Sequence, residues 1–139
     1  LRPGESKCLK TFRESELKGF EPGNCFIELT TEAVARDGTV YMHRNTYFFE
    51  AFKRCALSPA TLKAEVMEKN GVIRVVLSTD KPAFFVMLDT PGVPGRFSDN
   101  SLTLLPGEKR MLDFVPKGNA TAAGVRGALT VMSLRDTYR

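Results

Sequence analysis

The chain has 139 residues, of which 42% are hydrophobic and 26% are charged, and its formal net charge is +4. This size and composition are typical of a globular protein with one ordinary core or two small ones. The basic residues are scattered and form no tract of the kind that binds nucleic acid, and no apolar run reaches the roughly 20 residues that span a bilayer. We therefore expect neither a nucleic-acid partner nor a membrane span.

Residues 1–55 contain fewer strand patterns than a β-sandwich needs. The predicted elements are a brief helical piece at 14–18, strands at 25–30, 39–43 and 45–49, and a hairpin turn at 36–39. A sheet of so few strands leaves its edges and half of its core uncovered. We expect this region to be the closing part of a sandwich whose other strands lie elsewhere.

A short pattern occurs twice in the chain. Residues 1–9 and 104–112 both read L-x-P-G-E-x-[KR]-x-L, and each Pro-Gly turn is predicted to lead into a strand. The repetition favours two related sandwiches in tandem, the first without its opening strands. Because the chain lacks an initiator Met and Leu1 leads straight into a turn, we expect it to be a piece of a longer protein.

Residues 56–139 alternate between apolar and polar positions and predict about seven short strands. Alternation places Leu62, Ala64 and Val66 on one face, and Asn70-Gly71 predicts a type I′ hairpin turn. The next strand turns Ile73, Val75 and Leu77 inward. The run at 83–88 is apolar at nearly every position and predicts a central strand buried on both sides.

The last third of the chain continues this pattern. A short strand is predicted at 102–105, followed by a type II turn at 105–108 and a strand at 111–115 with Leu112 and Phe114 inward. Residues 118–127 read as a small-residue loop before a closing strand at 128–134. Such a density of strands predicts an all-β fold: an immunoglobulin-like sandwich at 56–139, preceded at 1–55 by the closing strands of a second, incomplete sandwich.

The sequence contains no familiar pattern for catalysis, cofactor binding or metal binding. Cys8, Cys25 and Cys55 lack CxxC spacing, and we interpret them as buried free thiols while leaving their pairing open. His43 is the only histidine and is predicted to be a structural residue at the end of a strand. We expect no catalytic residue, no metal ligand and no cofactor in this chain.

Four carboxylates are the remaining candidates for hydrolysis, since a glycosidase needs an acid and a nucleophile or base on opposite sides of the scissile bond. Asp89 ends a predicted strand, Asp99 lies in a turn, Glu108 follows a Pro-Gly turn and Asp113 faces outward from a strand. Spacing alone brings none of them together. We interpret them as turn caps and solubilising residues.

Residues 96–100, which read Arg96-Phe97-Ser98-Asp99-Asn100, form the most unusual polar cluster. One interpretation is a polar edge with one aromatic ring that contacts a sugar. The interpretation we favour is structural: Asp99 and Asn100 bind turn amides, Phe97 enters the core and Arg96 braces a neighbouring strand.

Asn119-Ala120-Thr121 is an N-x-T sequon in a predicted loop, where a glycan would fit. It bears on function only if the protein enters the secretory pathway.

Three stretches resemble the C-terminal region of β-mannosidases, in the glycoside hydrolase family that also contains β-galactosidases and β-glucuronidases. They are FVMLD at 85–89, GRFSDN at 95–100 and LLPGE at 104–108. The ending at 133–138 resembles the last strand and tail of those enzymes. Upstream, Asp37-Gly38 and residues 44–49 resemble the closing strand of their penultimate immunoglobulin-like domain. A Ser-Leu pair at 101–102, where an aromatic is expected, departs from the pattern and leaves the subgroup open.

The resemblance implies a non-catalytic part of a larger enzyme. In this family the catalytic glutamates lie on a (β/α)₈ barrel that precedes these domains, so no catalytic role falls on this chain. The whole enzyme would remove terminal non-reducing β-D-mannose from oligosaccharides, and this segment would stabilise and rim the barrel. Its partners would be the barrel and N-terminal sandwich domains of the same glycosidase. We expect a location in a lysosome or outside the cell and leave the cytoplasm open as the alternative. The alternative is a free-standing carbohydrate-binding or protein-binding immunoglobulin-like module.

Overall fold

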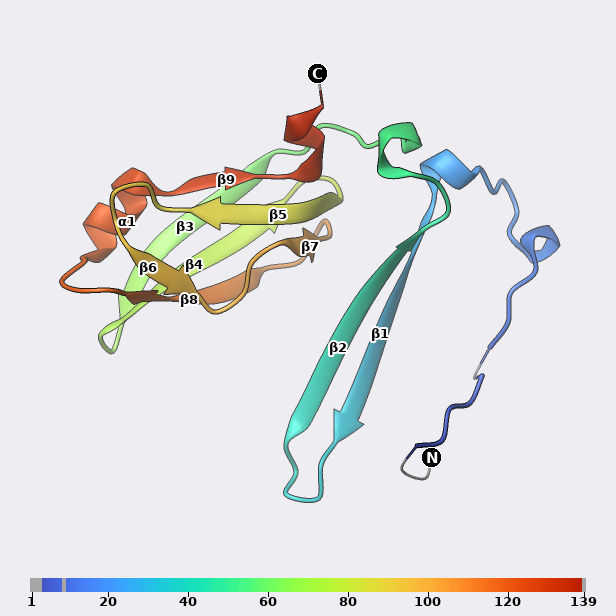
Figure 1. Cartoon of the computed structure of the whole chain (residues 1–139), viewed down its shortest axis with the longest axis horizontal. Helices are drawn as coiled ribbons and strands as arrows, with labels where there is room; N and C mark the ends of the chain where they lie inside the picture. The colour runs from blue at the N-terminus through green and yellow to red at the C-terminus, as the bar shows by residue number, and fades with distance from the viewer. Residues whose placement is uncertain (1–3, 9, 139) are drawn as a thin grey trace. The chain divides into compact units, whose positions relative to one another are not determined.

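The computed structural model describes residues 4–8 and 10–138 and divides the chain into two compact units, Leu1–Ala56 and Leu57–Arg139 (Figure 1). In its described residues, the first unit contains one β-hairpin and three short 3₁₀ turns. The second contains seven strands, a short helix and a final 3₁₀ turn. The predicted all-β class is confirmed, because the sheets are antiparallel throughout the described residues.

The hairpin of the first unit pairs β1 (Phe26–Val34) with β2 (Val40–Phe48) over nine residues each. At its turn, Gly38 has a positive φ of 83° and Asp37 accepts a hydrogen bond of 2.9 Å from the amide of Thr39. This bond holds the pKa of the Asp37 carboxyl below its ordinary value. The two strands predicted at 39–43 and 45–49 are one continuous strand. His43 therefore lies in the middle of β2 and not at the end of a strand.

Short 3₁₀ turns flank the hairpin. They are η1 (Glu14–Glu16), η2 (Pro22–Asn24) and η3 (Phe52–Arg54). The amide of Ala56 donates to the carbonyl of Gly23 at 2.8 Å, which joins the chain after β2 to the chain before β1. Residues 1–3 and 9 of the first L-x-P-G-E copy lie outside the described residues. Its described part forms no strand, nor do residues 10–13, so the strand predicted there is absent from the described chain.

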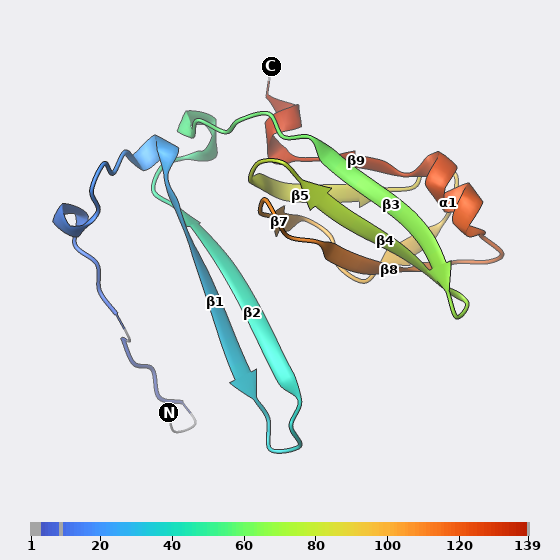
Figure 2. The same cartoon turned by 180° about the vertical axis from the view of Figure 1, so that it is seen from behind.

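Two sheets form the second unit. One has the order β3-β4-β8-β6 and the other the order β7-β5-β9. The strand bounds are β3 Leu62–Lys69, β4 Val72–Thr79, β5 Ala83–Asp89, β6 Gly95–Phe97, β7 Leu102–Leu104, β8 Arg110–Pro116 and β9 Thr130–Met132. Seen from behind, β3 and β4 lie in front of β5, so the sheets are two layers (Figure 2).

One apolar cluster between the layers forms the core. Its fully buried members come from both sheets and include Val75 and Leu77 of β4, Val86 of β5 and Leu104 of β7. Alternation predicted these inward positions of β4 correctly, along with Leu112 and Phe114 of β8. In β3, however, Ala64 is exposed and only Val66 is buried.

Both predicted turns of the second unit are confirmed. Asn70 and Gly71 have φ values of 54° and 74°, as a type I′ hairpin turn requires. In the second turn, Glu108 donates its amide to the carbonyl of Leu105 at 3.2 Å and Gly107 has a φ of 83°, which is the type II pattern.

Strand β5 is not buried on both sides as the apolar run predicted. Phe84, Val86 and Leu88 are buried, whereas Phe85 and Met87 are 39% and 49% exposed. Phe85 adopts a positive φ of 50° where the register with β7 shifts. Burial alternates from Phe84 to Leu88, so Phe85 and Met87 lie together on the outer face.

Residues 118–127 are not a loop throughout, because Ala122–Ala128 form helix α1. The hydroxyl of Thr121 accepts a hydrogen bond from the amide of Gly124 at 3.1 Å and caps the helix. Val125 is fully buried, and Arg126 donates to the carbonyl of Val66 at 2.7 Å. Contacts with strand β3, which is distant in sequence, therefore stabilise helix α1, although its small residues predicted a loop.

Candidate functional site

The loop between β6 and β7 is attached to the central strand β5 by the side chain of Asn100. Its Oδ1 accepts from the amide of Leu88 at 2.9 Å, and its Nδ2 donates to the carbonyl of Leu88 at 3.0 Å. The same Oδ1 accepts from the amide of Ser101, while Asp99 accepts from the amide of Asn100 at 2.8 Å. The carboxamide of Asn100 is thus used in holding the loop to the sheet.

The other members of the 96–100 cluster point in different directions. The ring of Phe97 lies 5.0 Å from the ring of Phe114 and packs against the core. Arg96 is exposed and pairs through its backbone with Val115. Asp99 lies 3.6 Å from the guanidinium of Arg110 at the surface. The structure brings Asp99 and Asn100 together in one turn. It directs Phe97 toward the core, where the ring could not contact a sugar at the surface.

The four candidate carboxylates occupy separate places. Asp89 ends β5 and accepts from the amide of Thr90 at 2.8 Å, and Asp113 in β8 pairs with Arg74 of β4 at 2.9 Å. Glu108 lies in the turn before β8. Within the part of the chain that the structure describes, no group of three or more His, Cys, Asp or Glu residues has the arrangement of a metal site.

The cysteines differ in burial, and all three are free. Cys55 is buried, and desolvation raises the pKa of its thiol. Cys25 is half-buried and Cys8 is exposed, so the prediction that all three are buried is wrong for Cys8. His43 is exposed on the hairpin, opposite Thr31.

Asn119 is exposed in the segment between β8 and α1. With Val93, Pro94 and Lys117 it lines an open pocket of about 330 Å³. Thr121, two residues on, is the N-cap of α1, so this sequon ends where a helix begins.

The outer faces of the two sheets differ in a way that sequence reasoning missed. On the β3-β4-β8-β6 sheet, charges such as the Arg74–Asp113 ion pair alternate with Met67, Met111 and Val115, which are 37%, 58% and 54% exposed. The β7-β5-β9 sheet instead presents Phe85, Met87 and Met132, which are 39%, 49% and 51% exposed. Met87 and Met132 are register partners and therefore lie side by side. We call these three residues the apolar patch.

Among the described residues, no helix has the length and apolar character needed to cross a membrane.

Comparisons with known proteins fit this architecture. Residues 57–137 match the Ig_mannosidase family model, which is described as an Ig-fold domain. The chain is also similar to β-mannosidase of Mus musculus, with 31% identity over 143 residues, and to β-mannosidase of Bos taurus, with 29%. Each match covers 99% of this chain but only 16% of the relative, so the chain spans about a sixth of the length of these relatives. The chain therefore belongs to the Ig_mannosidase family of Ig-fold domains and is homologous to the C-terminal region of β-mannosidases.

Proposed function

We propose that the chain is a non-catalytic segment of a β-mannosidase-type exo-glycosidase. The whole enzyme hydrolyses terminal non-reducing β-D-mannose residues, and this segment stabilises and rims the catalytic barrel carried elsewhere in the same protein. The observation that carries the proposal is the similarity to β-mannosidases along 99% of the chain, which includes the hairpin unit as well as the Ig-fold domain.

The apolar patch on the β7-β5-β9 sheet is the surface through which the Ig-fold domain docks on that barrel. Its side chains, Phe85, Met87 and Met132, stay partly exposed in this unit, and covering them with another domain contributes about 25 cal/mol for each Å² of apolar area removed from water. On the other sheet, exposed apolar residues such as Met111 lie among charged side chains such as Arg74 and Asp113, whose covering by an apolar surface is costly. The patch therefore gives the docked domain a defined orientation.

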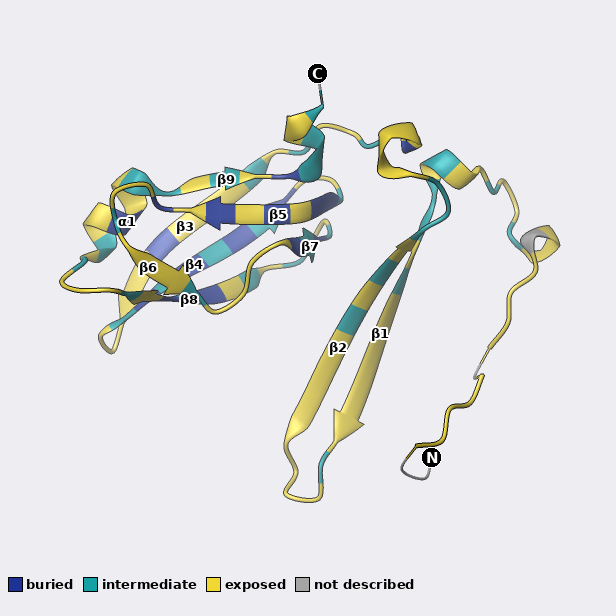
Figure 3. Ribbon diagram, in the orientation of Figure 1, coloured by how far each residue is buried: buried dark blue, intermediate teal, exposed yellow. Residues whose placement is uncertain are grey.

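The hairpin unit is the closing part of a penultimate Ig-like domain. A two-stranded sheet is at best marginally stable alone, and β1 and β2 are mostly exposed along their length (Figure 3). The rest of the parent protein supplies the strands that complete it. In this arrangement, residues 1–55 form part of one sandwich and residues 56–139 form the next.

The enzyme acts in the lysosome or outside the cell, and Asn119 carries an N-linked glycan there. Its exposure allows a glycosyltransferase to reach it. The chain is secreted from a eukaryotic cell and treated with peptide N-glycosidase. Removal of the glycan should increase the electrophoretic mobility of the treated chain over that of the untreated chain. The Asn119→Gln variant should already migrate at the increased mobility, and an unchanged mobility of the secreted wild-type chain would contradict the glycan.

The test of the enzymatic role is hydrolysis of 4-nitrophenyl β-D-mannopyranoside. We expect no hydrolysis by this chain alone, and hydrolysis when it is mixed with the preceding part of the parent polypeptide. Hydrolysis by the chain alone would mean that its own carboxylates are catalytic. If neither sample is active and the chain binds mannosides in calorimetric titration, the role of a carbohydrate-binding module replaces this proposal.

A further inference from the structure

The two faces of the β1–β2 hairpin differ in charge. Residues directly opposite each other in an antiparallel pair project to the same side, so the register separates odd-numbered from even-numbered residues. The odd-numbered residues of 27–33 and 41–47 contain no Asp, Glu, Lys or Arg, and we call their side the uncharged face. The even-numbered residues of 26–34 and 40–48 include Glu28, Glu32 and Arg44, and we call their side the charged face.

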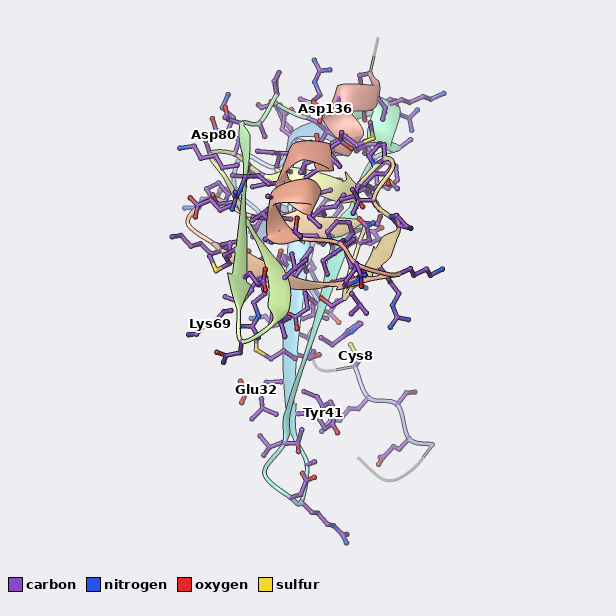
Figure 4. The ribbon with its side chains drawn as sticks, turned by 90° about the vertical axis from the view of Figure 1, so that its left-hand side faces the viewer. Cys8, Glu32, Tyr41, Lys69, Asp80 and Asp136 are labelled. Carbon is purple, nitrogen blue, oxygen red and sulfur yellow. The ribbon has the colours of Figure 1, made fainter. Side chains whose placement is uncertain are left out.

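Large apolar side chains on the uncharged face are well exposed. Leu29 is 58% exposed, and Tyr41 and Tyr47 are each 61% exposed. Figure 4, in which both residues are labelled, shows Glu32 and Tyr41 on opposite sides of the hairpin. The uncharged face therefore offers apolar and aromatic surface toward both ends of the hairpin, with the polar residues Thr31, His43 and Asn45 between them.

The charged face is less suited to an apolar partner. It also exposes apolar side chains, such as Met42, near the turn. Between these and the base of the hairpin, however, lies an ion pair in which Arg44 Nε is 3.2 Å from Glu28 Oε1. These side chains are still 27% and 15% exposed, and covering them with apolar surface would remove the remaining contact with water at a cost that often exceeds their mutual attraction.

The aromatic contacts at the base of the hairpin show which part of the chain approaches each face. On the uncharged side, the ring of Tyr47 lies 5.2 Å from that of Phe49, which lies 4.7 Å from that of Phe20. Phe20 belongs to the segment before β1. On the charged side, the ring of Phe48 lies 5.0 Å from that of Phe52, which follows β2. At the base of the hairpin, a ring from the upstream chain, Phe20, thus lies on the uncharged side, and Phe52 from the downstream chain lies on the charged side.

We propose that the uncharged face is the inner face of a sandwich and that an apolar β-sheet from an earlier part of the same parent polypeptide covers it. This inference rests on the proposed function, and it names the partner surface that completes the hairpin unit. A parent of the length of the β-mannosidase relatives has chain to supply such a sheet, because this segment spans 16% of them. Sheets in sandwiches pack about 10 Å apart through interdigitated apolar side chains, and Leu29, Tyr41 and Tyr47 provide one half of that layer.

Tyr41 and Met42 provide a matched pair for the test, since they are neighbours in β2, 61% and 68% exposed, on opposite faces. The dissociation constant between the 139-residue chain and the preceding part of the parent polypeptide is measured by calorimetry for the wild type, Tyr41→Lys and Met42→Lys. Hydrolysis of the chromogenic β-mannoside is recorded for each mixture. We expect Tyr41→Lys to weaken association at least tenfold and Met42→Lys to weaken it less than threefold. Leu29→Lys should behave as Tyr41→Lys does.

Other outcomes overturn the inference. A larger loss for Met42→Lys would make the charged face the inner one, and small losses for all variants would mean that the hairpin does not dock through either face. A wild-type chain that sediments as a dimer broken by Tyr41→Lys, with no binding to the upstream polypeptide, would assign the uncharged face to a second copy. Tight, face-dependent association in a mixture without hydrolysis would leave the inference standing while contradicting the proposed enzymatic function.

Discussion

The two units of this chain differ in how much of their apolar surface they bury. The Ig-fold domain encloses a cluster contributed by both sheets, in which Val75, Leu77, Val86 and Leu104 are inaccessible to solvent. In the described part of the hairpin unit, only Cys55 is buried, and large apolar side chains are exposed on both strands. The Ig-fold domain therefore has the core of an independent fold, whereas the hairpin has the pairing of a sheet without a second layer.

The hairpin shows that two strands can form all their backbone pairs without enclosing an apolar core. The hairpin has nine register pairs, yet it contributes no closed core, so its stability depends on what covers it. Variants that remove equal amounts of apolar surface from each unit test this directly.

The largest effect is expected for Leu77→Ala. Leu77 is fully buried between the two sheets, and its truncation leaves a cavity, so the free energy of unfolding of the Ig-fold domain should fall by about 3 kcal/mol. Urea unfolding of the full chain, followed through amide NMR signals of that unit, measures the loss. The matched control is Leu29→Ala in the hairpin, which should change stability by no more than about 0.5 kcal/mol. Equal losses would mean that the hairpin unfolds together with the Ig-fold domain.

A smaller loss is expected for Gly95→Ala in β6. A Cβ at this position would lie 2.1 Å from Cζ of Phe114, a buried ring that is itself packed against Phe97. Since the ring cannot move away without disturbing the core, stability should fall by about 2 kcal/mol. Gly127→Ala in helix α1 is the control, because its Cβ meets nothing within 4 Å and alanine favours the helix by about 0.5 kcal/mol. The stabilities of both variants are measured from urea midpoints. An unchanged stability of Gly95→Ala would show that the core is loosely packed around Phe114.

The loop before β7 should contribute stability and not chemistry. Asn100→Ala removes two hydrogen bonds to the main chain of Leu88 and should cost about 2 kcal/mol, whereas Asp99→Ala loses a turn bond and should cost about 1 kcal/mol. In the reconstituted enzyme, kcat should be nearly unchanged for Asp99→Ala. A large fall in turnover by a variant that keeps its fold would place Asp99 in the catalytic machinery.

Local sequence patterns predicted much of the Ig-fold domain. The Asn70-Gly71 turn and the Pro106-Gly107 turn depend on backbone preferences of the residues that form them, so they could be recognised without tertiary information. Alternation in β4, interrupted only by Val76 on the outer side, likewise predicted which face is buried, since one strand face must meet the core.

The errors occurred where distant contacts decide the structure. Helix α1 depends on the burial of Val125 and on the bond from Arg126 to Val66, and neither is visible in a run of small residues. The apolar run of β5 shows no alternation, so it could not reveal that Phe85 and Met87 on one face remain exposed. At the 96–100 cluster, the residue types indicated hydrogen bonds within a turn. They did not indicate that the side chain of Asn100 binds the main chain of strand β5.

The smallest effect concerns two aspartates with similar local chemistry in the two units. The amide of Thr61 donates to Asp80 at 2.6 Å, and this bond holds the pKa of the Asp80 carboxyl below its ordinary value, as the Thr39 amide does for Asp37. A lowered pKa in the folded state contributes stability above the ordinary carboxyl pKa, and this contribution is lost as the pH falls through the lowered value. Wild-type Ig-fold domain should therefore lose more stability than Asp80→Asn on acidification from pH 5 to pH 2, since the asparagine oxygen still accepts from Thr61 but does not titrate.

Asp37→Asn tests whether the hairpin unit and the Ig-fold domain unfold separately. Titration of Asp37 in the wild type should alter the amide signals of Gly38 and Thr39, and Asp37→Asn should have the same urea midpoint of the Ig-fold domain as the wild type at every pH, because the hairpin does not share that core. Urea midpoints at pH 2, 3, 4 and 5 for the wild type and both variants measure this. A shift of that midpoint by Asp37→Asn would mean that the hairpin unfolds together with the Ig-fold domain, and the two units would then be one cooperative body.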